Sequence, residues 1–274
     1  MQLVHNRAFD LAGSVPATAL EGHTWSALLA ATKGVPGRVL RSEGVVRDLA
    51  SATADFRDQY YGLRGCVIEA AEADDAGFPP LITSGLLDPA VALWGSRPTK
   101  FDKVTYRFPR VDVARLEPRL QEWARSRLRP KLMLATQTKV LEVFVDARGR
   151  FVPSVPVITV TADDISDLCR LGALLSSPPV TLVAACRHLG AAMSSEALKL
   201  SASDVLGLPL PTDRHAWELA AGHFENASQA TDAEARSAEL TASAHLMCEA
   251  FGLPEDPELM AWWSDRMPSL RPAR

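Results

Sequence analysis

The chain has 274 residues, a formal net charge of -4 and 47% hydrophobic residues. This length and composition exclude global disorder, because there is enough apolar surface to offset the entropy of folding. The sequence has no stretch of roughly 20 apolar residues that could span a bilayer, and its start lacks the pattern of a signal peptide. The four cysteines form no Cys-x-x-Cys pair. We therefore expect a cytoplasmic protein of one or two domains, with unpaired thiols and no membrane partner.

Charge is distributed unevenly along the chain. Residues 97–150 carry 14 basic and 6 acidic side chains, a net charge of +8, whereas residues 213–274 carry 5 basic and 11 acidic ones, a net charge of -6. A basic segment of this kind is typical of a surface that faces a polyanion. Two ordinary solvated surfaces would give the same distribution, and charge alone does not separate these interpretations.

The first 75 residues are expected to form a mixed α/β segment. Residues 24–31 predict a short helix, and Gly34 and Gly37 bracket a predicted turn. Residues 54–63 (ADFRDQYYGL) are rich in aromatic side chains, which allows two interpretations. The rings can stack on nucleic-acid bases, or they can be buried as part of the core.

Residues 76–130 begin with the Pro- and Gly-rich stretch 77–98, which suits an ordered loop. Apolar side chains then recur at helical spacing over residues 111–129, which predicts a helix. Arg127 and Arg129 would lie near the carboxyl end of this helix, where the helix dipole favours positive charge.

Residues 131–211 are predicted to contain the centre of the fold. Short apolar or β-branched runs predict strands over residues 132–135, 140–145 and 155–160. The segment 146–150 (DARGR) is predicted to make a hairpin turn into Phe151 and Val152.

Helices are expected on both sides of the proline pair at 178–179. Residues 165–175 show helical spacing, with an aspartate at 163–164 as N-cap, and the prolines end this helix. Residues 180–189 predict a further helix. The Ala-, Glu- and Leu-rich residues 217–251 predict two more helices, followed by a Pro-containing tail.

Several motifs that catalysis or cofactor binding requires do not occur in the sequence. It has no phosphate-binding Gly-Lys-Ser/Thr loop, no Gly-x-Gly turn of a dinucleotide or S-adenosylmethionine site, and no Gly-x-Ser-x-Gly elbow. Amino-methyltransferases also need Asn or Asp before Pro-Pro and an aromatic residue, and neither Asn6 nor Asn226 precedes Pro-Pro. Cys186 and His188 lack a second pair of zinc ligands, which favours a structural role. We therefore expect no catalytic residue, cofactor site or metal site in this chain.

The most distinctive segment lies between residues 129 and 160. It combines β-branched strands with Arg129, Lys131 and the polar run 136–139 (TQTK). Lys and Arg neutralise phosphates, and Thr and Gln bond to phosphates or base edges. A sheet with a polar outer face would show the same pattern, and the residues alone favour that second interpretation.

Four stretches between residues 50 and 215 follow one another in a distinctive order. They are DFRDQYYGL (55–63), LITSGLLDP (81–89) followed by Trp94-Gly95, PKL (130–132) continuing to TQTK (136–139), and LGALLSS (171–177) continuing through Leu189-Gly190-Ala191 to LPLP (208–211). Together they resemble the region that follows the catalytic domain in adenine-specific DNA methyltransferases of restriction–modification and phage-defence systems.

This resemblance implies a target-recognition domain. A lysine-bearing strand would open a small sheet, a helix with a Leu-Leu-x-Ser signature would follow, and a Leu-Pro-x-Pro segment would close the domain. Residues 217–270 resemble, more loosely, the helices that join subunits or clasp the catalytic domain. The catalytic half is missing, so the resemblance implies either a catalytic partner chain that binds S-adenosylmethionine, or a fragment or remnant of a larger enzyme.

We predict an α+β fold with a small twisted sheet, peripheral helices and a helical C-terminal region. The expected segments are 1–75, a DNA-binding domain of target-recognition type at 76–211, and 212–274. The predicted contacts to double-stranded DNA are Lys131, Thr136, Gln137, Thr138 and Lys139, with Arg107, Arg110 and Lys199 as outer phosphate contacts. The predicted function is sequence recognition for a split adenine-specific DNA methyltransferase. The alternatives are a protein-interaction subunit of a phage-defence complex that does not contact DNA, and an enzyme of unrecognised type.

Overall fold

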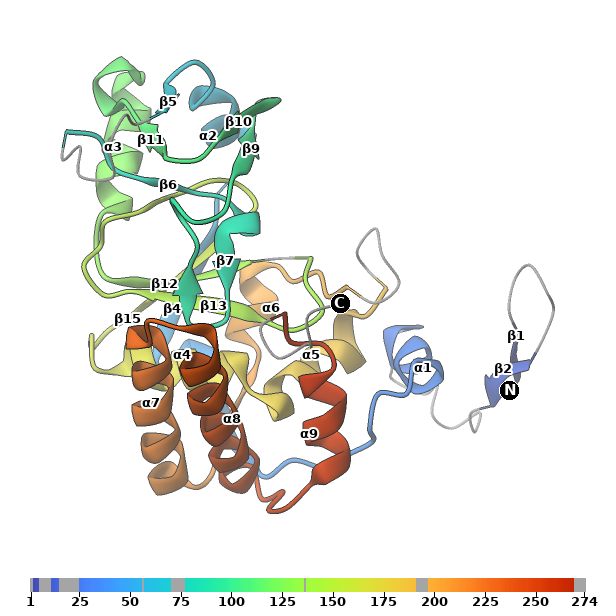
Figure 1. The fold of residues 1–274 in the computed structure, drawn as a ribbon. Helices are drawn as coiled ribbons and strands as arrows, with labels where there is room; N and C mark the ends of the chain where they lie inside the picture. The colour runs from blue at the N-terminus through green and yellow to red at the C-terminus, as the bar shows by residue number, and fades with distance from the viewer. Residues whose placement is uncertain are drawn as a thin grey trace.

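The computed structural model describes residues 2–4, 11–14, 25–55, 57–69, 77–135, 137–190 and 197–268. As predicted, the chain has an α+β fold (Figure 1). Its helices are α1 (Trp25–Thr32), α2 (Arg57–Gly62), α3 (Pro118–Arg127), α4 (Asp167–Ser176), α5 (Pro178–His188), α6 (Ala202–Leu206), α7 (Arg214–Gln229), α8 (Ala233–Ala250) and α9 (Pro257–Ser264).

The strands are short, and most of them pair in twos. They are β1 (Gln2–Val4), β2 (Leu11–Ser14), β3 (Ser42–Val45), β4 (Ala50–Ala54), β5 (Val67–Glu69), β6 (Leu81–Ile82), β7 (Leu87–Asp88), β8 (Val91–Ala92), β9 (Thr99–Phe101), β10 (Val104–Tyr106), β11 (Pro109–Val111), β12 (Lys131–Ala135), β13 (Glu142–Asp146), β14 (Val152–Pro153), β15 (Ile158–Ala162) and β16 (Pro209–Pro211). Among the described strands, only β13, β12, β15 and β4 form a larger sheet, which we call the central sheet.

The central sheet is antiparallel throughout, in the order β13-β12-β15-β4. Side chains alternate between the two faces of a strand, so Leu132 and Leu134 of β12 lie on one face and Met133 lies on the other. The face that carries Leu132 and Leu134 is covered by helices, which lie below the sheet in Figure 1. We call this the helix-covered face.

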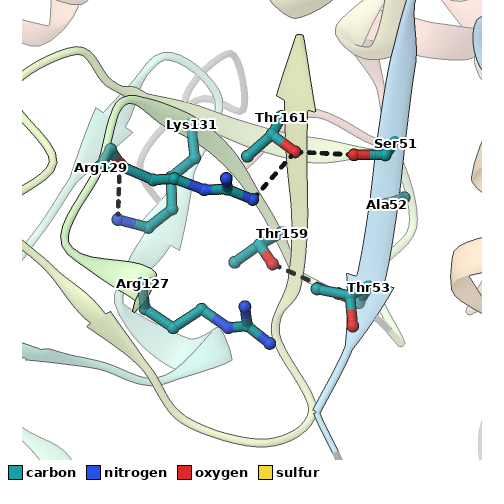
Figure 2. Close-up of a pocket in the computed structure, with 8 residues that line it drawn as sticks. All are labelled: Ser51, Ala52, Thr53, Arg127, Arg129, Lys131, Thr159 and Thr161. Carbon is teal, nitrogen blue, oxygen red and sulfur yellow. Dashed lines mark hydrogen bonds between the residues drawn. The ribbon is translucent and has the colours of Figure 1, made fainter. Parts of the chain in front are cut away.

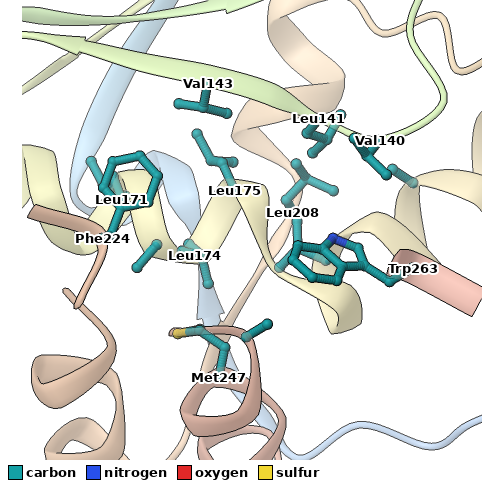
Figure 3. Close-up of a cluster of buried hydrophobic side chains, with 14 of the residues drawn as sticks. Val140, Leu141, Val143, Leu171, Leu174, Leu175, Leu208, Phe224, Met247 and Trp263 are labelled. Atoms are coloured by element: carbon teal, nitrogen blue, oxygen red, sulfur yellow. The ribbon is translucent and has the colours of Figure 1, made fainter. Parts of the chain in front are cut away.

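The main hydrophobic core lies between the helix-covered face and helices α4, α5, α7, α8 and α9 (Figure 3). The Phe224 ring is fully buried, and a Cβ added to Gly172 would lie 2.4 Å from it. Glycine at this position therefore lets α4 and α7 approach closely. Buried Trp263 of α9 donates a hydrogen bond from Nε1 to the carbonyl oxygen of Ser176 (3.0 Å), which ties α9 to the end of α4.

A second group of elements packs around its own cluster of buried side chains. These elements are α2, β5, β9, β10, β11 and α3, which we call the small lobe and which lie above the central sheet in Figure 1. Its cluster includes Leu63, Phe101 and Val111, so it draws on both sides of the predicted boundary at residue 75. The main core likewise contains residues on both sides of residue 211.

Helix α3 begins later than the helical spacing predicts. Strand β11 and a 3₁₀ turn (Val113–Arg115) come before it, and the helix starts at Pro118. Proline suits the first position of a helix because its φ is already helical and it lacks an amide that would need a partner. The prediction of one continuous helix over residues 111–129 was therefore wrong before Pro118.

The turn at residues 146–150 does not form the predicted hairpin. Strand β14, which follows it, pairs in parallel with β6 rather than with β13. The carboxylate of Asp146 accepts hydrogen bonds from the backbone amides of Arg150 and Phe151, both at 3.0 Å. These bonds close the turn and direct the chain away from the central sheet.

Several boundaries in the second half of the chain also differ from the predictions. The cap of α4 is Ser166 rather than an aspartate, and the predicted strand 155–160 lies at Ile158–Ala162. The proline pair begins α5, whose N-cap Ser177 accepts a hydrogen bond from the amide of Val180. Helix α9 lies in the tail where no helix was predicted, and Asp256 caps it.

No single helix in the described part of the chain is long and apolar enough to cross a membrane. Helices α4 and α5 pass that test only as a pair, and they are bent by 59° relative to each other. Both helices supply buried side chains to the main core, including Leu171, Leu174 and Val180. Their apolar character is therefore used in packing within the fold.

Candidate nucleic-acid interface

The second face of the central sheet is divided into two halves. Over β12 and β13, Met133 and Phe144 pack with Ile82, Leu87 and neighbouring apolar side chains. Over β15 and β4, the sequence instead places hydroxyl groups at alternate positions. These are Ser51, Thr53, Thr159 and Thr161, and we call this half the polar face.

The polar face arises because side chains alternate between the two faces along β4 and β15. In β4, Ala52 and Ala54 pack against the main core, so Ser51 and Thr53 point the other way. The registers Thr159↔Thr53 and Thr161↔Ser51 place the hydroxyls of the two strands side by side. Ser51 Oγ and Thr161 Oγ1 are 2.8 Å apart, and Thr159 donates to the carbonyl oxygen of Thr53.

A hollow of about 250 Å³ lies on the polar face. Figure 2 shows the side chains that line it, which come from β4, β15, β12, the end of α3 and the segment between α3 and β12. They are Ser51, Ala52, Thr53, Arg127, Arg129, Lys131, Thr159 and Thr161. The lining thus combines three basic side chains with four hydroxyl groups, and Arg127 and Lys131 are paired with Asp55 and Asp146 outside the lining. Arg129 and the hydroxyl groups remain as donors that suit an anion such as phosphate.

Arg129 supplies the exposed positive charge of this hollow. Its guanidinium donates to Thr161 Oγ1 at 3.5 Å, and no carboxylate in the described part of the chain lies within ion-pair distance of it. Gly149 adopts φ +63°, and a Cβ there would lie 2.5 Å from the backbone of Arg129. The turn at 146–150 therefore packs directly against Arg129 and fixes where its side chain begins.

Arg127 joins the small lobe to the central sheet. Its Nη2 lies 2.6 Å from Oδ1 of Asp55, which directly follows β4 and is buried. The indole nitrogen of Trp123 donates to the same oxygen at 2.9 Å. Because Asp55 compensates the charge of Arg127, this arginine contributes less to an anion site than Arg129 does.

Lys131 is buried, with 1% of its surface exposed. Its ammonium lies 2.6 Å from Oδ2 of Asp146, which is also buried, and it donates to the carbonyl oxygen of Arg129. Burial lowers the pKa of Lys131, and the carboxylate of Asp146 opposes this effect. The prediction of Lys131 as a direct DNA contact therefore needs correction, because in this fold its charge is used to hold the 146–150 turn.

Arg107 and Arg110 were predicted as outer phosphate contacts. Arg110 lies in β11 of the small lobe, and Arg107 lies just before this strand. Arg110 is 4% exposed; it donates to the carbonyl oxygen of Phe78 and lies over the Trp94 ring, 4.9 Å from its centre. A buried guanidinium does not reach a phosphate, so Arg110 also needs correction as a direct contact. Arg107 is exposed, and its Nε donates to the carbonyl oxygen of Gly95.

The remaining predicted contacts gather at the far end of β12, except Thr136, which lies outside the described residues. The backbone amide of Leu198 donates a hydrogen bond to the carbonyl oxygen of Thr138 at 2.7 Å, which places Lys199 beside the loop 137–139. Lys199 and Gln137 are exposed, and Thr138 and Lys139 are half-buried. Thr138 Oγ1 donates to the carbonyl oxygen of Val140. These residues therefore form a second polar group, separated from Arg129 by the length of β12.

The sequence prediction missed the hydroxyl groups of the polar face. A signal for them exists, because residues 50–54 (ASATA) and 158–162 (ITVTA) alternate small or apolar residues with Ser or Thr. This period of two is typical of a strand with one buried and one polar face. Knowing that the two strands are neighbours requires the fold, since about a hundred residues separate them.

No family model matches the sequence, and no curated protein matches it. Among solved structures, the fold is similar to that of the Type IIL restriction-modification enzyme MmeI in complex with DNA, with a TM-score of 0.47 and 8% sequence identity. The alignment covers 84% of this chain and 37% of that enzyme, so the chain spans little more than a third of its length. A likeness at this level transfers no residue role to the chain.

Proposed function

We propose that the chain is a DNA-binding recognition subunit and that the polar face of the central sheet contacts the phosphate backbone of double-stranded DNA. The observation that carries this proposal is the hollow in which exposed Arg129 lies beside the hydroxyl groups of Ser51 and Thr161. Guanidinium and hydroxyl donors are the groups through which proteins most often contact phosphate oxygens. Phosphate contacts position a protein on the duplex.

The second polar group supports the same role. Gln137 and Lys199 are exposed at the far end of β12, and Gln137 adopts φ 68° in the loop that follows the strand. An exposed amide can read base edges, whereas a lysine neutralises a phosphate. In this proposal, Arg129 positions the duplex, and Gln137, Thr138 and Lys139 approach a groove.

The finer part of the proposal concerns methylation. We propose that the chain directs an adenine-specific methyltransferase of a restriction–modification or phage-defence system, whose catalytic chain is separate. That partner would bind S-adenosylmethionine and flip the adenine out of the duplex, because its amine is not reachable in a stacked pair. The resemblance of residues 50–215 to target-recognition regions supports this assignment.

Binding of the purified chain to a pool of duplex DNA, selected at several salt concentrations, tests the proposal. We expect binding that weakens steeply with salt and that retains preferred sequences. Replacing Lys139 by Ala should weaken binding and flatten its salt dependence. Absence of binding at low salt, together with capture of a methyltransferase chain, would instead identify a protein-interaction subunit that does not contact DNA.

A further inference from the structure

The small lobe presents an aromatic side chain to solvent. Tyr61 at the end of α2 is 55% exposed, whereas its neighbour Tyr60 is half-buried and packs on Phe101, with ring centres 5.0 Å apart. The rings of Tyr60 and Tyr61 are 5.6 Å apart in an edge-on arrangement. Of these two neighbouring rings, Tyr60 is therefore half-buried and packed, whereas Tyr61 is exposed.

The hairpin β9–β10 carries a further exposed apolar side chain. Val104 pairs with Phe101 in the register of the hairpin, and Val104 is 50% exposed. Val104, Phe101, Tyr60 and Tyr61 therefore follow one another in a row whose two ends are exposed, with Phe101 buried between them. Asp102 and Lys103 both adopt positive φ, as a tight two-residue hairpin requires, which holds the tip in place.

Charged side chains of both signs lie near this row. The guanidinium of Arg64 lies 5.8 Å from the centre of the Tyr61 ring and forms an ion pair with Asp102 at 2.9 Å. Lys100 and Lys103 are exposed on the hairpin. The carboxylate of Glu69, also in this lobe, already accepts hydrogen bonds from the backbone amides that follow β10. The positive charge of the hairpin is therefore only partly compensated.

We propose that Tyr61 forms a stacking site for an unpaired nucleobase, and that exposed Lys103 at the tip of the hairpin contacts a flanking phosphate. The exposed apolar area is limited to single side chains, and the cations of Arg64 and Lys103 lie near it, which suits a base on a charged strand better than the apolar surface of a protein. An unpaired base is required, because both faces of a base inside a duplex are already stacked. This site is separate from the polar face and does not depend on it.

Binding of a fluorescently labelled oligo(dT) strand of about ten nucleotides tests the proposal by anisotropy. We expect Tyr61→Ala to weaken binding about tenfold, because one base loses its stacking partner, while Tyr61→Phe keeps most of the affinity. The matched control is Leu219→Ala, which removes an exposed apolar side chain from α7 and should change nothing. Circular dichroism confirms that each variant is folded.

The same variants are titrated with duplex DNA to separate this site from the polar face. Loss of oligo(dT) binding in Tyr61→Ala, with duplex binding intact, is the expected result. A wild-type chain that does not bind oligo(dT), or a Tyr61→Ala variant that binds it as wild type does, overturns the stacking site. Capture of a protein partner that depends on Tyr61, without oligo(dT) binding, overturns it as well and identifies a docking surface.

Discussion

The two faces of the central sheet are built from the same four strands but differ in what covers them. On the helix-covered face, Leu132, Leu134 and Val160 are fully buried beneath α4 and its neighbours. On the polar face, Ser51 and Thr161 remain in contact with solvent. The helix-covered face provides stability, whereas the polar face over β15 and β4 keeps the exposed donors Ser51 and Arg129 beside its buried groups. Substitutions on the helix-covered face should therefore lower the free energy of unfolding, whereas substitutions of the exposed donors on the polar face should lower duplex affinity.

The largest effect on stability is expected from Phe224→Ala on the helix-covered side. The fully buried ring fills the space between α4 and α7, so its removal leaves a cavity. We expect the free energy of unfolding to fall by about 3–5 kcal/mol, measured by chemical denaturation. Duplex affinity, measured where the variant is still folded, should not change. A loss of duplex affinity in the folded variant would show that the helix-covered face also contributes to DNA binding.

Lys131→Met should have the next largest effect. It leaves the buried carboxylate of Asp146 without its ammonium partner, and breaking one side of a buried pair typically costs about 3 kcal/mol or more. The matched control is the double variant Lys131→Met/Asp146→Asn, which removes both charges and should regain part of the loss. A single variant as stable as wild type would show that Lys131 does not hold the turn.

Gly149→Ala tests whether the turn at 146–150 positions Arg129. The new Cβ would meet the backbone of Arg129 at 2.5 Å in a left-handed conformation, so we expect a loss of about 2 kcal/mol and weaker duplex binding. Gly34→Ala is the control, because Gly34 has φ +67° but nothing within 4 Å. It should cost about 1 kcal/mol and leave binding unchanged. Equal effects of both variants on binding would contradict the positioning role.

The smallest effect on stability is expected from Ser51→Ala. Among the described residues, the exposed hydroxyl bonds only to Thr161, so the free energy of unfolding should change by less than about 0.5 kcal/mol. Duplex affinity should fall about threefold, because one donor to phosphate is lost. Ser203→Ala, an exposed serine of α6, serves as the control in the same titration. Unchanged duplex affinity in Ser51→Ala would show that the Ser51 hydroxyl does not contact the phosphate.

The sequence predicts the positions of helices and strands more accurately than the residues of the candidate site. The helices α1, α5, α7 and α8 and the strand β12 lie close to their predicted positions, because their periodicity and Pro or Gly boundaries are local signals. The pairing of β14 with β6 and the burial of Lys131 depend on contacts far apart in the sequence. A lysine in a polar segment carries the same local pattern whether it faces DNA or a buried aspartate. The polar face was missed for the same reason.

In the proposed complex, Arg129 on the polar face contacts a DNA phosphate. The most direct test is the salt dependence of duplex binding by wild type, Arg129→Ala and the control Arg214→Ala, which removes an exposed arginine at the start of α7. We predict that Arg129→Ala reduces the slope of log affinity against log salt concentration by about one, while Arg214→Ala retains the wild-type slope. An Arg129→Ala variant with the affinity and slope of wild type would show that Arg129 does not contact a phosphate.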